Sequence, residues 1–560
     1  LAKVKAEMEA GFVFGLQSVS GKVSQLAANQ TFTGNPNYIE QDVERYASVT
    51  KEDVMRVFNR YIKDKHAVIM SVVPNGQLDK IAAKDNFTPS KRKVPEQSST
   101  SADELVLRKA TDNFDRSVIP SAGANKPVSV PQMWQKTLDN GIRVLGTPSI
   151  ETPTTSLLLK VPAGHYYVDK DKAGLVSILA QMLNESTTKR SAEEMSIALD
   201  KLGSSVYISP GNKYLNVHVN ALTRNLDATL ALVDEKLRFP AFKEDEFTRV
   251  KSNAIQGAIN SKKNAGYLAS TAYRRLLQED NIASLPVSGT EATLNNITLA
   301  NVRAYFHSQV KPENGQLIVV SDLKKQKVLS SLSAFDAWKG KGKALSLTLP
   351  TPDTKMGVIY LVNKDKAAQS AIRIGKRSLT QDVLGEYYKS SLMNFPLGGA
   401  FNSRINLNLR EDKGYTYGAR SYFSADRLSG TYTASAEVRA DVTDKSVVEF
   451  VNEIKRYRKE GITDEELAFM RNAINQKDAL KYETPRAKLN FLAQILEYDL
   501  APDFVKKRAK IVESISKDEI NALAKKHLNV NDMLMVIVGD SATLRPELEA
   551  LGYKVIDFEI

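Results

Sequence analysis

Residues 139–187, DNGIRVLGTPSIETPTTSLLLKVPAGHYYVDKDKAGLVSILAQMLNEST, decide the fold. Asn140-Gly141 is a turn dipeptide between two short strand-like runs, which predicts a β-hairpin. TTSLLLKV (154–161) has the length and composition of a further strand, and LVSILAQML (175–183) is apolar enough for a buried helix. The order hairpin, strand, helix predicts a mixed α+β unit that opens near Trp134.

The chain repeats part of itself at an offset of 466 residues. In this internal repeat, Val49–Val54 aligns without a gap with Ile515–Ile520, and Val68–Val72 aligns with Leu534–Val538. A weaker third copy follows Ile297 and is slightly shifted. Each copy predicts a capped helix followed by a buried strand. Recurrence at about 220–250 residues indicates a duplicated α+β unit rather than a short-period solenoid.

This pattern predicts four segments along the chain. The linker is rich in Ser, Pro and Lys and has little apolar periodicity. The predicted segments are 1–85 (C-terminal part of an upstream unit), 86–131 (linker), 132–345 (one unit) and 346–560 (a final unit). Since residues 1–85 match only the end of a unit, we interpret the chain as a fragment. The alternative is a natural short subunit that begins with half a unit.

Composition excludes several classes of protein. The 560 residues are 42% hydrophobic and 25% charged, which is ordinary for globular domains. The net charge of +12 is mild over this length, and no basic block is interleaved with aromatics, so no nucleic-acid partner is expected. No apolar run reaches the length of a membrane span. The lack of cysteine excludes disulfides, thiolate metal sites and a Cys nucleophile.

No complete catalytic or metal-binding motif occurs in the sequence. The nearest two of its five histidines are 53 residues apart, and neither H-E-x-x-H nor H-x-x-E-H is present. We therefore assign no catalytic residue and no metal ligand to this chain.

The stretch 139–187 resembles the opening of the insulinase/pitrilysin-type (inverzincin) zinc peptidases. In that family a strand-turn-strand is followed by the helix G-L-A-H-x-x-E-H-M-L, which carries two His ligands and the catalytic Glu. Here Ser177 and Gln181 stand at the His positions and Ala180 stands at the Glu position. The helix expected to carry the third ligand has no acidic residue from Phe247 through Gln278. The resemblance therefore implies a noncatalytic repeat that does not bind zinc.

A second segment, LGGAFNSRINLNLREDKGYTYGARSYF (397–423), resembles the family's G-G-x-x-S-R-L-x-x-x-L-R-x-x-x-G-x-x-Y segment. The likeness implies that Arg410 and Tyr417 reach the zinc site of the other half and hold the substrate carbonyl. Both are hydrogen-bond donors, which a developing oxyanion needs. Tyr415 is the alternative tyrosine, and a surface Arg with a packed Tyr is the plain structural alternative. Gly398-Gly399 is expected to be a loop near the chamber or an ordinary turn.

The resemblance implies an α+β fold of tandem duplicated units, each a mixed or antiparallel sheet with packed helices, in an insulinase-like half-clamshell. One function it implies is the noncatalytic half of a zinc endopeptidase that encloses extended peptides. Zn would belong to the complete enzyme, in an upstream catalytic half or a zinc-bearing partner chain, and this chain alone would be inactive. The alternative is a nonenzymatic scaffold subunit. Bacterial relatives of this size are commonly exported, so the expected compartment is the periplasm or cell envelope.

Overall fold

The computed structural model describes residues 1–84, 130–349, 353–478 and 481–560, with isolated positions between 86 and 118. Apart from Val130, Pro131 and those positions, the predicted linker lies outside the described residues. Contacts divide the chain into one unit formed by Leu1–Ala47 with Asn125–Ile560, and a second formed by Ser48–Ala124. No helix within the described ranges has the length and apolar character needed to cross a bilayer.

The first sheet grows from the hairpin that the sequence predicts. Gly141, at φ +87°, turns the chain between the first two strands, which pair antiparallel. The described residues of this sheet form six strands in the order β1-β2-β6-β3-β5-β4, of which only β2 and β6 are parallel. Their bounds are β1 (Trp134–Thr137), β2 (Arg143–Pro148), β3 (Thr154–Val161), β4 (Ser205–Pro210), β5 (Leu215–Leu222) and β6 (Gln316–Ser321).

The second sheet repeats this topology. Its described strands have the order β12-β7-β11-β8-β10-β9, with β7 parallel to β11 and to β12 and the remaining pairs antiparallel. Their bounds are β7 (Ile359–Asn363), β8 (Gln369–Ser378), β9 (Thr416–Ala425), β10 (Gly430–Arg439), β11 (Leu534–Gly539) and β12 (Val555–Asp557). If the outer strands β1 and β12 are left out, the first sheet has the order β2-β6-β3-β5-β4 and the second has the order β7-β11-β8-β10-β9. The five strands of each sheet therefore follow one another in the same spatial order and with the same relative directions. The predicted fold of duplicated, mixed-sheet α+β units is confirmed.

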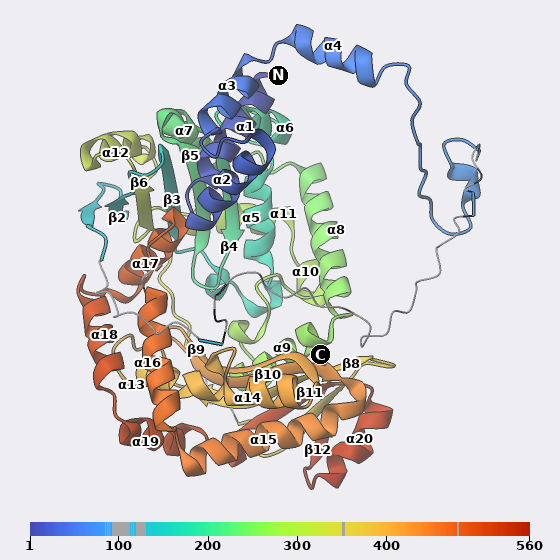
Figure 1. Ribbon diagram of the computed structural model, residues 1–560, viewed down its shortest axis with the longest axis vertical. Helices are drawn as coiled ribbons and strands as arrows, with labels where there is room; N and C mark the ends of the chain where they lie inside the picture. Colours follow the sequence, from blue (N-terminus) through green and yellow to red (C-terminus); the bar gives the residue numbers. More distant parts are fainter. Residues whose placement is uncertain are drawn as a thin grey trace. The chain divides into compact units, whose positions relative to one another are not determined.

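Within the larger unit, helices cover faces of both sheets (Figure 1). Before the first sheet come α1 (Ala2–Gly15), α2 (Val19–Thr33), α3 (Ile39–Ser48) and α4 (Lys51–Tyr61). With the first sheet come α5 (Leu175–Asn184), α6 (Ala192–Lys201), α7 (Leu226–Arg238), α8 (Glu244–Ser261), α9 (Ala265–Gln278), α10 (Glu291–Asn295), α11 (Leu299–Gln309) and α12 (Lys325–Ser331). With the second come α13 (Glu386–Asn394), α14 (Arg404–Asn406), α15 (Thr443–Glu460), α16 (Asp464–Asp478), α17 (Pro485–Tyr498), α18 (Phe504–Ser514), α19 (Lys517–His527) and α20 (Ser541–Ala550).

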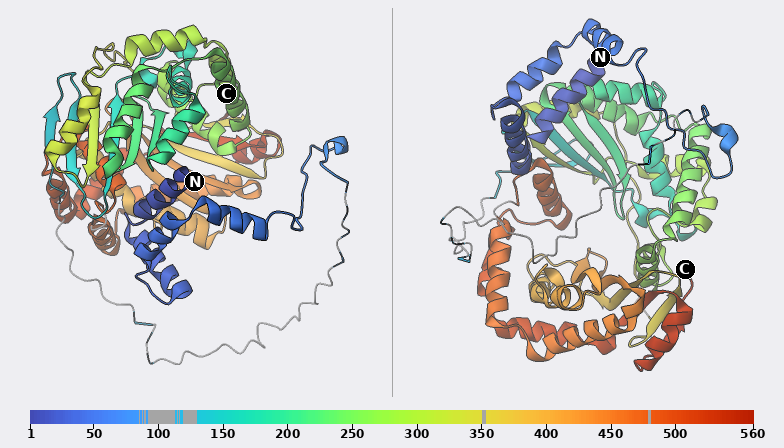
Figure 2. Two further views of the ribbon diagram at one scale, coloured as in Figure 1. Left: turned by 90° about the horizontal axis from the view of Figure 1, so that it is seen from above. Right: turned by 45° about the vertical axis from the view of Figure 1, so that its right-hand side comes forward.

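The two sheets exchange covering helices. One face of the second sheet packs on α15 and α19, and its other face packs on α9, which precedes that sheet in sequence (Figure 1). Conversely, α17, which lies between β10 and β11 of the second sheet in sequence, packs on the face of the first sheet formed by β2, β3 and β6. Figure 2 shows the two sheets as separate layers, with the first in cyan to yellow-green and the second in yellow to red. The exchange buries apolar surface from both series, so it ties the two layers together.

The internal repeat also appears in the helices. Shifted by the same offset, the bounds of α2, α3 and α4 match those of α17, α18 and α19 to within one residue. Thr50 caps α4 with a capping box to Asp53, as Ser516 caps α19. The buried strand predicted at Val68–Val72 is wrong. These residues form no strand here, and the side chains of Val68, Ile69 and Met70 are 79–100% exposed. Their counterpart β11 is buried because β7 and β8 pair with it on either side.

Asparagine side chains cap the free edges of both sheets. Asn184, at the end of α5, donates from Nδ2 to the carbonyl of Ile208 in β4 at 2.8 Å and accepts the Ile208 N–H at 3.0 Å. Asn394, at the end of α13, donates from Nδ2 to the carbonyl of Ser421 in β9 at 2.7 Å. These contacts use backbone groups that would otherwise lie unpaired on an edge strand.

Replacing Asn184 with alanine is expected to destabilise the first sheet by about 1–3 kcal/mol, because Ile208 is buried and its amide and carbonyl would lose their partners. Chemical denaturation followed by Trp fluorescence measures this, since Trp338 lies in the core of that unit and the partly buried Trp134 packs against it. Asn296→Ala, which removes one exposed hydrogen bond to the Asp171 carbonyl, is the control. Equal losses in the two variants would contradict the edge-capping role.

Candidate functional site

A cavity of about 1020 Å³ lies along β9 and contains both residues predicted to hold the substrate. Arg410 comes from the helical segment before β9, and Tyr417 is the second residue of β9. Tyr415, the alternative tyrosine, is not among the described residues that line the cavity. The structure thus brings Arg410 and Tyr417 to one surface.

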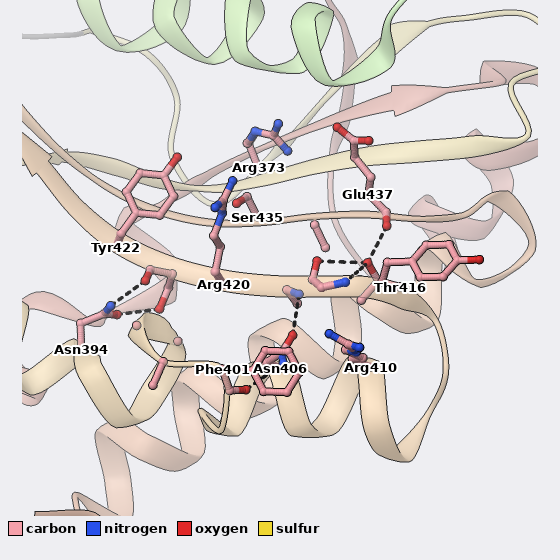
Figure 3. Close-up of a pocket in the computed structure, with 18 of the residues that line it drawn as sticks. Arg373, Asn394, Phe401, Asn406, Arg410, Thr416, Arg420, Tyr422, Ser435 and Glu437 are labelled. Carbon is pink, nitrogen blue, oxygen red and sulfur yellow. Dashed lines mark hydrogen bonds between the residues drawn. The ribbon is translucent and has the colours of Figure 1, made fainter. Parts of the chain in front are cut away.

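Arg410 is positioned by the aromatic ring of Phe401 (Figure 3) and by the carboxylate of the neighbouring residue Glu411. Its guanidinium carbon lies 4.6 Å from the ring centroid of Phe401, and its Nε lies 3.2 Å from the Glu411 carboxylate. Asn406 donates to the Phe401 carbonyl at 2.8 Å and accepts the Ala419 N–H of β9 at 3.0 Å. The half-exposed guanidinium is therefore ordered by its surroundings while its outer donors still face the cavity.

Tyr417 is 91% exposed. It lies within the bulge of β9, where pairing with β10 shifts from Ala419 opposite Ala436 to Thr416 opposite Val438. Neighbouring Thr416 donates to the Glu437 carbonyl at 2.6 Å, which fixes the backbone at this point. An exposed phenol on an ordered strand can donate a hydrogen bond to a bound group at no cost to the core.

Two π-helical segments, Phe395–Gly399 and Leu407–Asp412, shape the floor of this cavity. Gly398 and Gly399 therefore do not form the expected loop or turn. A β-carbon on Gly398 would lie 2.4 Å from the backbone nitrogen of Ser421, so glycine lets this segment approach β9 closely. Single π-helical turns are frequent at functional sites.

The positions that correspond to zinc ligands lie together on α5 and α8. Ser177 and Gln181 line a cavity of about 310 Å³ with Asn253 and Gly257 of α8, and Ala180 is buried. Arg249 also lines this cavity and pairs with Glu185 at 2.7 Å. Among the described residues, no group of three or more His, Cys, Asp or Glu is placed to hold a metal ion. A hydroxyl and amides beside a guanidinium do not fit a Zn²⁺ site.

A second cavity, of about 820 Å³, lies between α9 and the strands β8–β10. Arg373 and Tyr422 line both this cavity and the one that holds Arg410, so the two adjoin. Arg373 is not among the predicted site residues, and neither are Phe401 and Asn406 in the first cavity. Arg373 did have a signal, because it is a lone charge in the apolar run Ala371–Ile374 of β8.

Comparisons with known proteins agree with this architecture. Residues 143–283 match the family described as Insulinase (Peptidase family M16), and residues 296–474 match the Peptidase M16 inactive domain. The chain is 23% identical over 375 residues to "Non-peptidase homolog YmxG" of Helicobacter pylori, covering 66% of this chain and 86% of that protein. It is 22% identical over 401 residues to an "Uncharacterized zinc protease" of Rickettsia felis, covering 68% and 96% respectively.

Solved structures show the same fold. The crystal structure of a peptidase M16 inactive domain from Pseudomonas fluorescens matches with a TM-score of 0.67 and 21% identity, covering 73% of this chain and 98% of that one. A protease from Helicobacter pylori matches with a TM-score of 0.66 and 17% identity, covering 73% and 100%. With two successive family domains matched and the fold shared, the chain belongs to peptidase family M16, the insulinase family, and includes its inactive domain.

Proposed function

We propose that this chain is the noncatalytic half of a zinc-dependent endopeptidase, which encloses extended peptides and helps to hold the scissile carbonyl. The observation that carries the proposal is the meeting of Arg410 and Tyr417 at one cavity, with their donors toward open space. The zinc, bound by an upstream catalytic half or a partner chain, would activate the attacking water. Arg410 and Tyr417 would donate hydrogen bonds to the carbonyl oxygen as negative charge develops on it.

Exposed apolar side chains on α2 support the proposal that another unit packs against this helix. Val19, Val23 and Leu26 form an i, i+4, i+7 stripe whose side chains are 41–58% exposed. In the internal repeat, Val23 and Leu26 correspond to Leu489 and Leu492 of α17, which are buried on the first sheet. By the same packing, α2 would cover a sheet of an upstream unit. The exposed apolar side chains at 68–72 correspond to the central strand β11 and would enter a sheet in the same way.

Reconstitution with a zinc-bearing half tests the proposal. We expect this chain alone to leave a fluorogenic peptide intact, and the two parts together to cleave it in a zinc-dependent manner. Cleavage by the pair should fall when Arg410 is replaced by glutamine. Arg545→Gln, at a surface ion pair on α20 with Glu549, is the matched control. Cleavage by the pair that does not respond to Arg410→Gln would contradict the role in holding the carbonyl.

The second candidate function is a nonenzymatic scaffold. The relative named a non-peptidase homolog favours it. A scaffold has no carbonyl to hold, so it would bind its partners equally well with Arg410 and Tyr417 replaced. The effect of those two substitutions separates the alternatives.

A further inference from the structure

The cavity between α9 and β8–β10 has cationic groups without matching carboxylates. Arg274 of α9 and Arg373 of β8 both line it, and burial lowers the pKa of each guanidinium. Both side chains nevertheless remain cations, because a guanidinium does not lose its proton in proteins. Arg373 donates to the Ile372 carbonyl at 2.9 Å and to Ser270 Oγ at 3.4 Å, which are both neutral groups. Within the described part of the chain, neither arginine forms an ion pair with a carboxylate.

The acidic groups nearby are engaged or belong to the adjoining cavity. Asp426 lines the same cavity, but its Oδ1 accepts the N–H groups of Leu428 and Ser429 at 2.7 and 2.9 Å. Glu437 lines the adjoining cavity and acts on Arg373 through its charge, without forming an ion pair with it. Arg420 of β9 adds a further positive charge on that side. The joined cavities therefore carry more positive than negative side chains.

A buried amide beside the arginines points to a ligand with its own hydrogen-bond donors. Gln278 lies four residues after Arg274 on α9, so both share a helix face, and it is only 7% exposed. Its Nε2 donates to Ser429 Oγ at 3.2 Å, but its buried Oε1 has no hydrogen-bond partner. Buried polar atoms are normally satisfied. A peptide offers both groups that this site lacks, a carboxylate for the guanidinium groups and an N–H for the amide oxygen.

We propose that this cavity binds a carboxylate of the peptide substrate, with Arg274 and Arg373 as the charged donors and Gln278 Oε1 accepting a peptide N–H. The inference rests on the proposed function, since it names the class of peptide that the same chamber prefers. The carboxylate is that of an acidic side chain or of the peptide's C-terminus. Planar guanidinium groups suit either source, because both offer two oxygens to paired donors.

Peptide binding to this chain alone tests the site, independently of zinc and of cleavage. Fluorescence anisotropy would compare a labelled ten-residue peptide that contains two Glu residues and a free C-terminus with its Glu→Gln version and its C-terminally amidated version. We expect at least one of the two neutralised peptides to bind about tenfold more weakly, which identifies the source of the carboxylate. Equal binding of all three peptides would overturn the proposal.

Substitutions test whether Arg274 and Arg373 cause the difference in binding between charged and neutralised peptides. Arg274→Gln and Arg373→Gln should each remove the discrimination between charged and neutral peptides, whereas Arg545→Gln on α20 should retain it. Arg274→Lys keeps the charge without the planar fork, so it should retain part of the discrimination and serves if the glutamine variant does not fold. Discrimination that survives in folded Arg274→Gln and Arg373→Gln would refute the site. Tyr417→Phe should leave the discrimination intact, so failure of the carbonyl-holding role and failure of this site are distinguishable.

Discussion

Tyr417→Phe in the complete enzyme is expected to lower kcat about 100-fold, the scale of losing one oxyanion donor. The phenol is 91% exposed, so its removal takes away no buried contact and no core hydrogen bond. The urea midpoint of the variant should therefore equal that of the unchanged protein. Steady-state cleavage of a fluorogenic peptide, with the midpoint measured in parallel, checks both parts of this prediction.

Tyr207→Phe is the matched control for Tyr417→Phe. Tyr207 is 57% exposed and lies on β4, which has the edge place in the first sheet that β9 has in the second. It lines none of the cavities described above. We expect removal of its hydroxyl to leave kcat unchanged. Equal kcat in correctly folded Tyr417→Phe would show that Tyr417 does not hold the carbonyl.

Leu492→Ala is expected to lower the free energy of unfolding by about 2–5 kcal/mol, because it opens a cavity at a fully buried leucine. Leu492 lies on α17 and packs with Ile318 and Val320 of the first sheet. The substitution should therefore weaken the packing of α17 on the first sheet. Urea denaturation followed by the fluorescence of Trp338, in the core of the first sheet, and of Trp134, which packs against that core, measures the change.

Leu26→Ala, at the equivalent position of the internal repeat, gives the internal comparison. Leu26 is 41% exposed on α2, so its truncation should change the stability of this chain by no more than about 0.5 kcal/mol. In the presence of the upstream half, the same substitution should weaken association, since α2 would then cover a sheet as α17 does. An unchanged association constant would contradict that placement of α2.

Much of the fold could be predicted because local signals and packing agree. The Asn140-Gly141 turn predicts the hairpin of β1 and β2, and the apolar run 175–183 forms α5. The internal repeat predicts the correspondence of α4 with α19, since capping residues and apolar periodicity are local properties. The strand predicted at 68–72 failed for a nonlocal reason, because a central strand needs neighbours on both sides.

The candidate site could be predicted only in part. Arg410 and Tyr417 came from a motif whose spacing is visible in one stretch of sequence. Arg373 lies near them because β8, β9 and β10 are side by side in the second sheet. Arg274 reaches the adjoining cavity because α9 packs on the second sheet although it precedes that sheet in sequence. Exchange of helices between sheets is a tertiary property, so no local pattern in either segment predicts it. The π-helical turn at Gly398 likewise follows from close packing on Ser421.

The central claim is that the zinc site lies outside this chain while the chain supplies Arg410 and Tyr417. Its most direct test is denaturing mass spectrometry with peptide mapping and zinc analysis of the protein isolated in active form from its native cells. We predict a sequence that carries H-x-x-E-H, joined to this chain or present beside it in equal amount, with one zinc ion per assembly. Active protein that contains no such sequence and no zinc would contradict the account.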